Sequence, residues 1–98
     1  MNKMVIWSPA AEEDLAIILD YLKHKWSPNV IKKFIDKVDE HLRLISDDPG
    51  IFPIINKELR IRKSVITKHN TLYYREANRK IEVIRLFDSR QDPKKLKF

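Results

Sequence analysis

The 98-residue sequence predicts an α+β fold with an N-terminal strand, an antiparallel two-helix hairpin, and a mainly antiparallel sheet that ends in a C-terminal three-stranded meander. Two observations predict this class. Apolar residues recur at helical spacing in two consecutive segments and then at alternating spacing in the C-terminal half. Only a few residues separate the helical segments, so the two helices are expected to pair and to cover one face of the sheet.

The first elements are a short strand at residues 4–7 and a helix with a strong start signal. Ser8 has a side chain that can accept a hydrogen bond from the helix backbone, and Pro9 suits the first helical position. Acidic residues follow near the start, where the helix dipole favours them, and this role is preferred to paired-carboxylate catalysis. They are Glu12, Glu13 and Asp14.

The second helix repeats the start signal with Ser27 and Pro28. Its apolar stripe runs from Ile31 to Ile45, and the run Asp-Asp-Pro-Gly at residues 47–50 stops it. Each helix has one apolar stripe, so both require a further apolar surface to cover. The strands of the C-terminal half are expected to supply it.

The first strand of the meander follows an expected loop at residues 50–56. In this strand the apolar residues Leu59, Ile61 and Val65 are expected to face the helices. Because side chains alternate along a strand, the polar residues between them are expected on the sheet face that the helices leave open. These are Arg60, Arg62 and Ser64.

Two more strands are expected around residues 71–76 and at residues 80–87, with a tight turn at residues 78–79 between them. The last strand is apolar enough on both faces to lie in the middle of the sheet. The alternation also requires that either Tyr73 or Tyr74 faces inward, and the pattern leaves open which one.

Composition excludes several classes of protein. The chain has no cysteine, so disulfides and thiolate zinc sites are excluded, and a cytoplasmic location is expected. Its 43% hydrophobic content suffices for one core, so one domain over residues 1–98 is expected. Neither a signal peptide nor a membrane span is expected, because the apolar runs are only a few residues long. His24, His41 and His69 stand on different predicted elements, so neither a metal nor a cofactor is expected.

The net charge of +6 is divided unevenly along the chain. Residues 1–56 hold 7 Lys/Arg against 9 Asp/Glu, whereas residues 57–98 hold 13 against 5. The basic surplus therefore belongs to the C-terminal part. It indicates either a polyanionic partner, which is nucleic acid or an acidic protein, or a lysine-rich solvated surface, and charge alone leaves these readings equal.

Basic residues of this part are candidate ligands for phosphate, because the arginine fork matches two phosphate oxygens. Several on one face could hold a backbone phosphate and stabilise charge during its cleavage. Tyr73 could stack on a base, and His69 is either a proton-transfer group or a surface turn residue. The basic candidates are Arg60, Arg62, Lys63, Lys68, Arg75, Arg85 and Arg90, followed by Lys94 and Lys95.

Three segments, in this order, make the chain resemble the RelE/ParE family of type II toxin–antitoxin toxins. They are VIWSPAAEEDL at residues 5–15, LYYRE at 72–76 and IEVIRLFDSRQDPKKL at 81–96. The resemblance covers nearly the whole chain and implies the RelE/ParE toxin fold. It also implies an antitoxin partner that wraps over the toxin, with operator DNA bound only through the toxin–antitoxin complex.

The family resemblance implies two possible activities. RelE-like members cut mRNA in the ribosomal A site, where the RNA 2′-hydroxyl attacks the adjacent phosphate and basic residues stabilise the charge. ParE-like members instead inhibit DNA gyrase and require no nuclease site. Both kinds inhibit growth, and some stabilise plasmids.

The nuclease pattern of the family is only partly present. By resemblance, Arg90 matches the arginine that follows the last strand and contacts the scissile phosphate, and Arg62 matches one basic residue of the nuclease strand. Other positions depart from the pattern. Ser64 stands in place of a lysine, Thr71 in place of an arginine, and Leu96 near the position of a C-terminal tyrosine.

The expected function is therefore a ParE-like toxin that acts on gyrase, with a RelE-like endoribonuclease using Arg90 and Arg62 as the alternative and a degenerate toxin that only binds antitoxin as a third reading. Asp88 and Asp92 flank Arg90, so an ion pair with no role in phosphate binding stays possible. The antitoxin segment is expected to be acidic or amphipathic and to lie over the helical hairpin or across the basic surface. Apolar contacts for it are expected at Ile17, Ile18 or Trp26.

Overall fold

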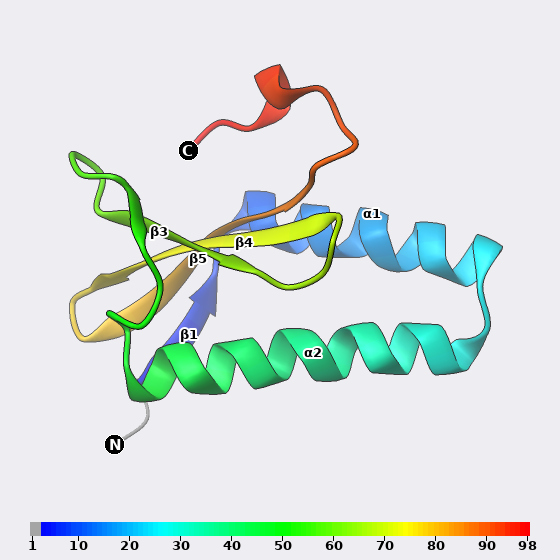
Figure 1. Ribbon diagram of the computed structural model, residues 1–98, viewed down its shortest axis with the longest axis horizontal. Helices are drawn as coiled ribbons and strands as arrows, with labels where there is room; N and C mark the ends of the chain where they lie inside the picture. The colour runs from blue at the N-terminus through cyan, green and yellow to red at the C-terminus, as the bar shows by residue number, and fades with distance from the viewer. Residues whose placement is uncertain (1–2) are drawn as a thin grey trace.

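A computed structural model describes residues 3–98 and confirms the predicted fold class, with two helices against one face of a five-stranded sheet (Figure 1). The first two residues of the expected domain lie outside the described residues. The elements are β1 (Met4–Trp7), α1 (Pro9–Lys25), α2 (Pro28–Asp47), β2 (Ile54–Asn56), β3 (Ile61–Val65), β4 (Asn70–Ala77), β5 (Lys80–Asp88) and a 3₁₀ turn (Pro93–Lys95).

The strand order in the sheet is β1-β5-β4-β3-β2, and every neighbouring pair is antiparallel except the parallel pair β1 and β5. The chain between β1 and β5 includes the helical hairpin and the strands β2 to β4, and this long connection makes the parallel pair possible. β5 has a neighbour on each side, as its apolar sequence predicts. The strand β2 lies within the expected loop at residues 50–56, so the sequence prediction missed it.

The two helix starts differ in their caps. Ser8 Oγ accepts a hydrogen bond from the Ala11 N–H at 3.0 Å, and its hydroxyl donates to the Ile84 carbonyl on β5 at 2.7 Å. The serine therefore caps α1 and fixes it to the sheet. Ser27 precedes α2 at the predicted position, but its side chain makes no cap hydrogen bond.

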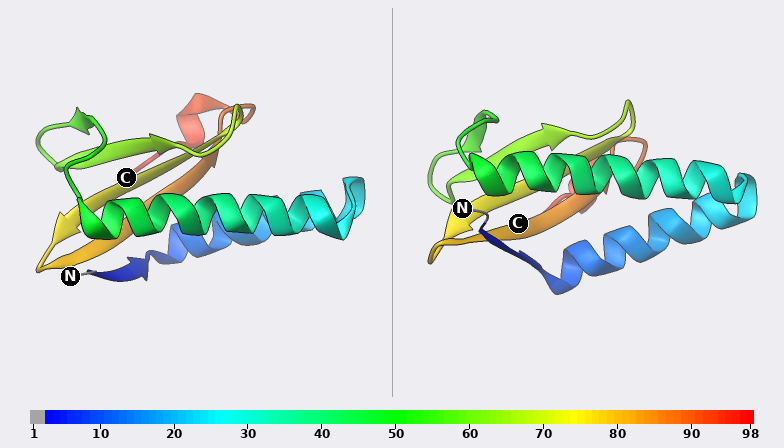
Figure 2. Two further views of the ribbon diagram at one scale, coloured as in Figure 1. Left: turned by 60° about the horizontal axis from the view of Figure 1, so that its bottom comes forward. Right: turned by 90° about the horizontal axis from the view of Figure 1, so that it is seen from below.

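The helical hairpin and the sheet form two layers (Figure 2), and the hydrophobic core lies between them. Each large apolar side chain buried here stabilises the fold by about 1.5–3 kcal/mol. The core side chains are Ala11 and Ile18 of α1, Phe34, Val38 and Ile45 of α2, and Ile66, Leu72, Tyr74, Ile81, Val83 and Leu86 of the sheet and its β3–β4 connection.

The predicted orientation of β3 is wrong. Ser64 is fully buried and hydrogen-bonds His41 on α2, and the guanidinium of Arg62 donates to the Phe52 carbonyl at 2.7 Å. Arg62 and Ser64 therefore point to the helix side, and Val65, 56% exposed, points away from it. A polar side chain is tolerated beneath α2 because His41 satisfies it.

Two residues that were expected to belong to this alternating strand precede it instead. Leu59 and Arg60 lie in the turn before β3, and Arg60 has a positive φ of 57°. The turn at Asn78 and Arg79, in contrast, is as predicted. Both residues have positive φ, 53° and 62°, which is the backbone that a tight hairpin requires.

A bulge in β5 lets Val83 and Leu86 both face the core although they are three positions apart. Tyr73 pairs with Arg85 and Tyr74 pairs with Val83, so Ile84 is the extra residue. Tyr74 faces the helices, is fully buried, and donates its hydroxyl to the Pro49 carbonyl at 2.8 Å. Tyr73 faces the opposite side, which answers the question that the alternation left open.

Candidate functional site

A groove of about 920 Å³ lies between the helical hairpin and the β3–β4 end of the sheet, and we call it the hairpin groove. Its walls are mainly apolar. They are formed by Ile17, Ile18, Tyr21, Leu22 and Trp26 of α1 and its end, and by Val30 and Phe34 of α2. Its polar lining consists of Lys33, Asp36, Lys37 and Glu40 on α2, and Thr67, His69, Asn70, Asp88, Arg90 and Gln91 from the sheet side.

The apolar lining of the hairpin groove is exposed because the hairpin extends past the sheet. Figure 2 shows the turn between α1 and α2 projecting beyond the strands. Side chains near that turn therefore have no sheet beneath them, and Ile17, Tyr21 and Trp26 are 51%, 42% and 58% exposed. A contiguous exposed apolar surface of this kind marks an interaction site.

Arg90 lies at the polar end of the hairpin groove. Its Nε donates to Asp88 Oδ1 at 3.0 Å and its Nη2 to Asp88 Oδ2 at 2.7 Å, and the guanidinium lies 5.4 Å from the ring centroid of Tyr21. Arg90 therefore faces the hairpin groove and not the sheet face opposite the helices. The bidentate bond to Arg90 lowers the pKa of Asp88, and the same bond raises the pKa of Arg90.

A second candidate surface is the sheet face opposite the helices, which we call the distal face. Its central row joins three strands in register, with Lys63 of β3 beside Tyr73 of β4 and Tyr73 beside Arg85 of β5. Arg75 follows on β4, where it lies 3.6 Å from Glu82. Burial raises the pKa of Tyr73, so its hydroxyl is uncharged at neutral pH.

The chain's own C-terminal segment crosses part of the distal face. After β5 the segment turns back toward the strands (Figure 1). Arg85 Nη1 donates to the carbonyls of Lys95 and Lys97 at 3.0 and 3.2 Å, and the Phe98 ring lies 5.3 Å from that of Tyr73. The expected open face is therefore partly covered.

Arg85 is not a free ligand for an anion, because Asp14 holds it. Asp14 Oδ2 accepts from Arg85 Nε at 2.7 Å and from the Leu86 N–H at 3.0 Å, and Asp14 Oδ1 accepts from Arg85 Nη2 at 3.0 Å. The hydrogen bond to Asp14 raises the pKa of Arg85. The sequence prediction assigned Asp14 to the helix dipole and missed this pair, since nothing local connects residues so far apart.

The remaining predicted site residues divide between separate places. Lys63, Tyr73 and Arg75 lie on the distal face, and Lys94 and Lys95 are exposed on the C-terminal segment beside it. His69 lines the hairpin groove, and Lys68 is exposed in the β3–β4 turn.

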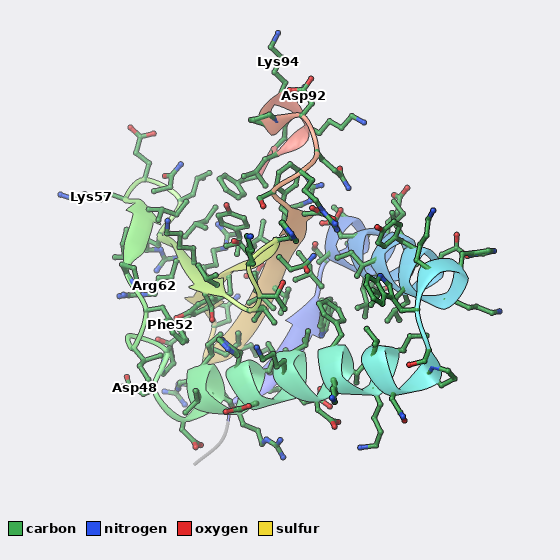
Figure 3. All side chains as sticks on the ribbon, turned by 45° about the vertical axis from the view of Figure 1, so that its right-hand side comes forward. Asp48, Phe52, Lys57, Arg62, Asp92 and Lys94 are labelled. Carbon is green, nitrogen blue, oxygen red and sulfur yellow. The ribbon has the colours of Figure 1, made fainter. Side chains whose placement is uncertain are left out.

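Arg62 and Arg60 belong to neither surface. Arg62 turns toward Phe52, as the labelled side chains in Figure 3 show, and Arg60 is exposed in the turn before β3. Their roles in phosphate binding remain predictions, as does the catalytic role of Arg90.

Two kinds of site are not found in the described part of the chain. Within residues 3–98, no three His, Cys, Asp or Glu side chains lie close enough to hold a metal ion. Over the same residues, neither helix combines the length and the apolar character needed to cross a membrane.

Comparison with known families identifies the family to which the chain belongs. The model of the ParE toxin of type II toxin–antitoxin system, parDE, matches residues 5–93. The chain belongs to this ParE toxin family. The resemblance seen in the sequence is thereby confirmed, and the protein is the toxin component of a type II toxin–antitoxin system. No curated protein sequence matches the chain.

Three solved structures share the fold of this ParE-family toxin. The chromosomal ParDE TA system from P. aeruginosa has a TM-score of 0.72 at 15% identity, covering 88% of this chain and 95% of that one. The YoeB/ParE toxin from Agrobacterium tumefaciens has a TM-score of 0.62 at 14% identity, with coverages of 87% and 96%. The YoeB-YefM complex from Staphylococcus aureus has a TM-score of 0.61 at 19% identity, with coverages of 89% and 97%.

Proposed function

We propose that this ParE-family toxin arrests growth by inhibiting DNA gyrase and that a cognate antitoxin neutralises it. The observation that carries the choice of target is the position of Arg90, which is bound to Asp88 at the hairpin groove. Its guanidinium therefore does not lie beside Lys63 and Tyr73 on the distal face. The cations that a nuclease would gather around a scissile phosphate are divided between two surfaces, which favours a target that requires no nuclease site.

A supercoiling assay with purified toxin, gyrase and relaxed plasmid tests the target. We expect the toxin to reduce the supercoiled product and the toxin–antitoxin complex to leave it unchanged. Normal supercoiling at a large molar excess of active toxin would contradict the proposal. We assign target contacts to the distal face, so Lys63→Gln and Lys95→Gln should weaken inhibition, while Lys23→Gln on α1 is the matched control.

An alternative function, mRNA cleavage on the ribosome, is favoured by one feature of the distal face. Tyr73 could stack on a base there, with Lys63 beside it in the sheet and Lys94 and Lys95 near the edge. Primer extension on translated mRNA separates the two functions. Cleavage that is lost in Lys63→Gln supports the nuclease, and its absence with wild-type toxin removes it. If induction of the gene causes no growth arrest, the chain is a degenerate toxin that only binds antitoxin.

For the antitoxin, we propose that an amphipathic segment occupies the hairpin groove. Family membership implies such a partner, and one of the three similar solved structures is a YoeB-YefM complex. The groove offers exposed apolar side chains that the toxin's own core does not use, which include Ile17 and Trp26. Their burial by a partner segment would remove this apolar surface from water.

Co-expression tests the position of the antitoxin. Ile17→Glu should leave the toxin active but weaken its neutralisation, because the substitution puts a charge into the apolar wall of the hairpin groove. Leu44→Glu is the matched control, since Leu44 is similarly exposed on α2 but does not line the groove. If both variants are neutralised like the wild type, the antitoxin lies elsewhere.

A further inference from the structure

The β3–β4 turn at the end of the hairpin groove fixes the orientation of a buried amide. Thr67 Oγ1 accepts hydrogen bonds from the backbone N–H groups of His69 and Asn70, both at 3.2 Å. With its acceptor positions used, the hydroxyl donates its single proton to Asn70 Oδ1 at 2.8 Å. The oxygen of the Asn70 side chain is therefore the atom beside Thr67, and the NH₂ group points elsewhere.

This NH₂ group has no hydrogen-bond partner. Asn70 is only 8% exposed, and its Nδ2 is a buried donor that no described acceptor satisfies. Buried polar groups in native proteins are nearly always paired, so an orphaned donor requires an explanation. Asn70 lines the hairpin groove, and it lies opposite Asp88 in the sheet.

The charged pair at the same end of the groove also leaves donors in excess. Both Asp88 oxygens accept from Arg90, and Asp88 Oδ1 accepts from the Arg90 backbone N–H as well. The third guanidinium nitrogen, Nη1, is not used by Asp88, and the Arg90 side chain is 48% exposed. An amide donor and a half-exposed guanidinium together would bind a negatively charged group with oxygen acceptors.

We infer that the segment filling the hairpin groove places a carboxylate at its β3–β4 end, where it accepts from Asn70 Nδ2 and Arg90 Nη1. The occupant is an amphipathic segment of the antitoxin, with apolar side chains against Tyr21 and Trp26 and one aspartate or glutamate at this end. The inference rests on the antitoxin site proposed above and adds the chemistry that fixes the segment's direction and register. Because Nδ2 is shielded from water in the free toxin, a covering side chain moves aside as the segment enters.

A double-mutant cycle with the antitoxin tests this inference. Asn70→Ala and Arg90→Gln on the toxin are combined with the exchange of each antitoxin aspartate or glutamate for its amide, and Kd is measured by calorimetry. We expect each toxin variant to weaken binding roughly 10- to 100-fold, with the loss coupled to one particular acidic residue. Coupling to no acidic residue would overturn the inference.

Controls separate this result from misfolding and from failure of the proposed site. Asn56→Ala also removes an amide that accepts a hydrogen bond, from the Leu59 N–H, but it lies on β2 outside the groove. Arg43→Gln removes an exposed arginine from α2 outside the groove. Both controls should bind like wild type. If Ile17→Glu weakens binding but Asn70→Ala and Arg90→Gln do not, the groove is the antitoxin site and the carboxylate contact is wrong.

Nuclear magnetic resonance of the wild-type toxin provides a second readout that needs no variant. The Asn70 side-chain NH₂ signals should move downfield when the antitoxin binds, because the NH₂ group then donates a hydrogen bond to the antitoxin carboxylate. They should move back when the coupled acidic residue is changed to its amide. An Asn70 NH₂ pair that is unchanged on complex formation would overturn the inference.

Discussion

Asp14 and Arg85 form a two-pronged ion pair that joins the start of α1 to the middle of β5 across 71 positions of the sequence. The side chains of both residues are only 13% exposed. The same arginine also holds the C-terminal segment through the carbonyls of Lys95 and Lys97. One guanidinium therefore connects the helical layer, the sheet and the chain's end.

The first prediction concerns this pair. Asp14→Ala should lower the free energy of unfolding by about 3 kcal/mol, because it leaves a nearly buried guanidinium without its partner. Urea denaturation measures the change. The exposed pair Lys32–Asp36 provides the control, and Asp36→Ala should cost less than about 1 kcal/mol. Equal effects of the two substitutions would show that burial does not strengthen the Asp14–Arg85 pair.

The second prediction compares the two serines that precede the helices. Ser8→Ala should destabilise the protein by about 1 kcal/mol or more, since it removes the α1 cap and the hydrogen bond to the Ile84 carbonyl. Ser27→Ala should have little effect, because Ser27 makes no side-chain cap hydrogen bond. Thermal unfolding of the two variants measures both effects, and the prediction fails if Ser27→Ala is the more harmful.

The third prediction uses the adjacent tyrosines. Tyr74→Phe should cost about 1 kcal/mol, because the fully buried hydroxyl donates to the Pro49 carbonyl and that carbonyl would lose its partner. Tyr73→Phe should be nearly neutral for stability, since its hydroxyl makes no such bond within residues 3–98. Denaturant midpoints of the two variants give the comparison, and a larger loss for Tyr73→Phe would contradict the assigned orientation of β4.

The fourth prediction concerns pH. The bond to Arg90 lowers the pKa of Asp88 below its ordinary value, so ionised Asp88 stabilises the folded state above the unfolded pKa of about 4. This contribution is lost as the pH falls through the lowered folded pKa. Asp88→Asn should therefore be less stable than wild type at neutral pH, and the difference should shrink in acid. Arg90→Gln removes the cause of the shift, so an unchanged pH dependence in that variant would contradict the assignment.

Helix starts and the β4–β5 turn could be predicted from the sequence because their signals are local. Ser8 with Pro9, Ser27 with Pro28, and the pair Asn78 and Arg79 each act through backbone within a few positions. The central place of β5 was also predictable, because a strand with neighbours on both sides needs apolar side chains on both faces.

The orientation of β3 and the position of Arg90 could not be predicted, because distant contacts decide them. Ser64 can face inward because its hydroxyl forms a hydrogen bond with His41, which is 23 positions away in the sequence. The alternation of apolar and polar residues along the strand gives no information about so distant a partner. Asp88 and Tyr21 hold Arg90 at the hairpin groove, and Tyr21 belongs to another element. Arg85, which looked like a free cation, is neutralised by a helix residue.

The extra residue at Ile84 changes which positions of β5 face the helices. Before the bulge the odd-numbered Ile81 and Val83 face the core, and after it the even-numbered Leu86 does. Without Ile84, Val83 would be followed directly by Arg85, and the ladder with β4 would be regular. Arg85 and Asp88 would then keep the sides that they have now. A one-residue deletion at this position is therefore a change of length that leaves the acid of the hairpin groove, and the arginine bonded to it, in place.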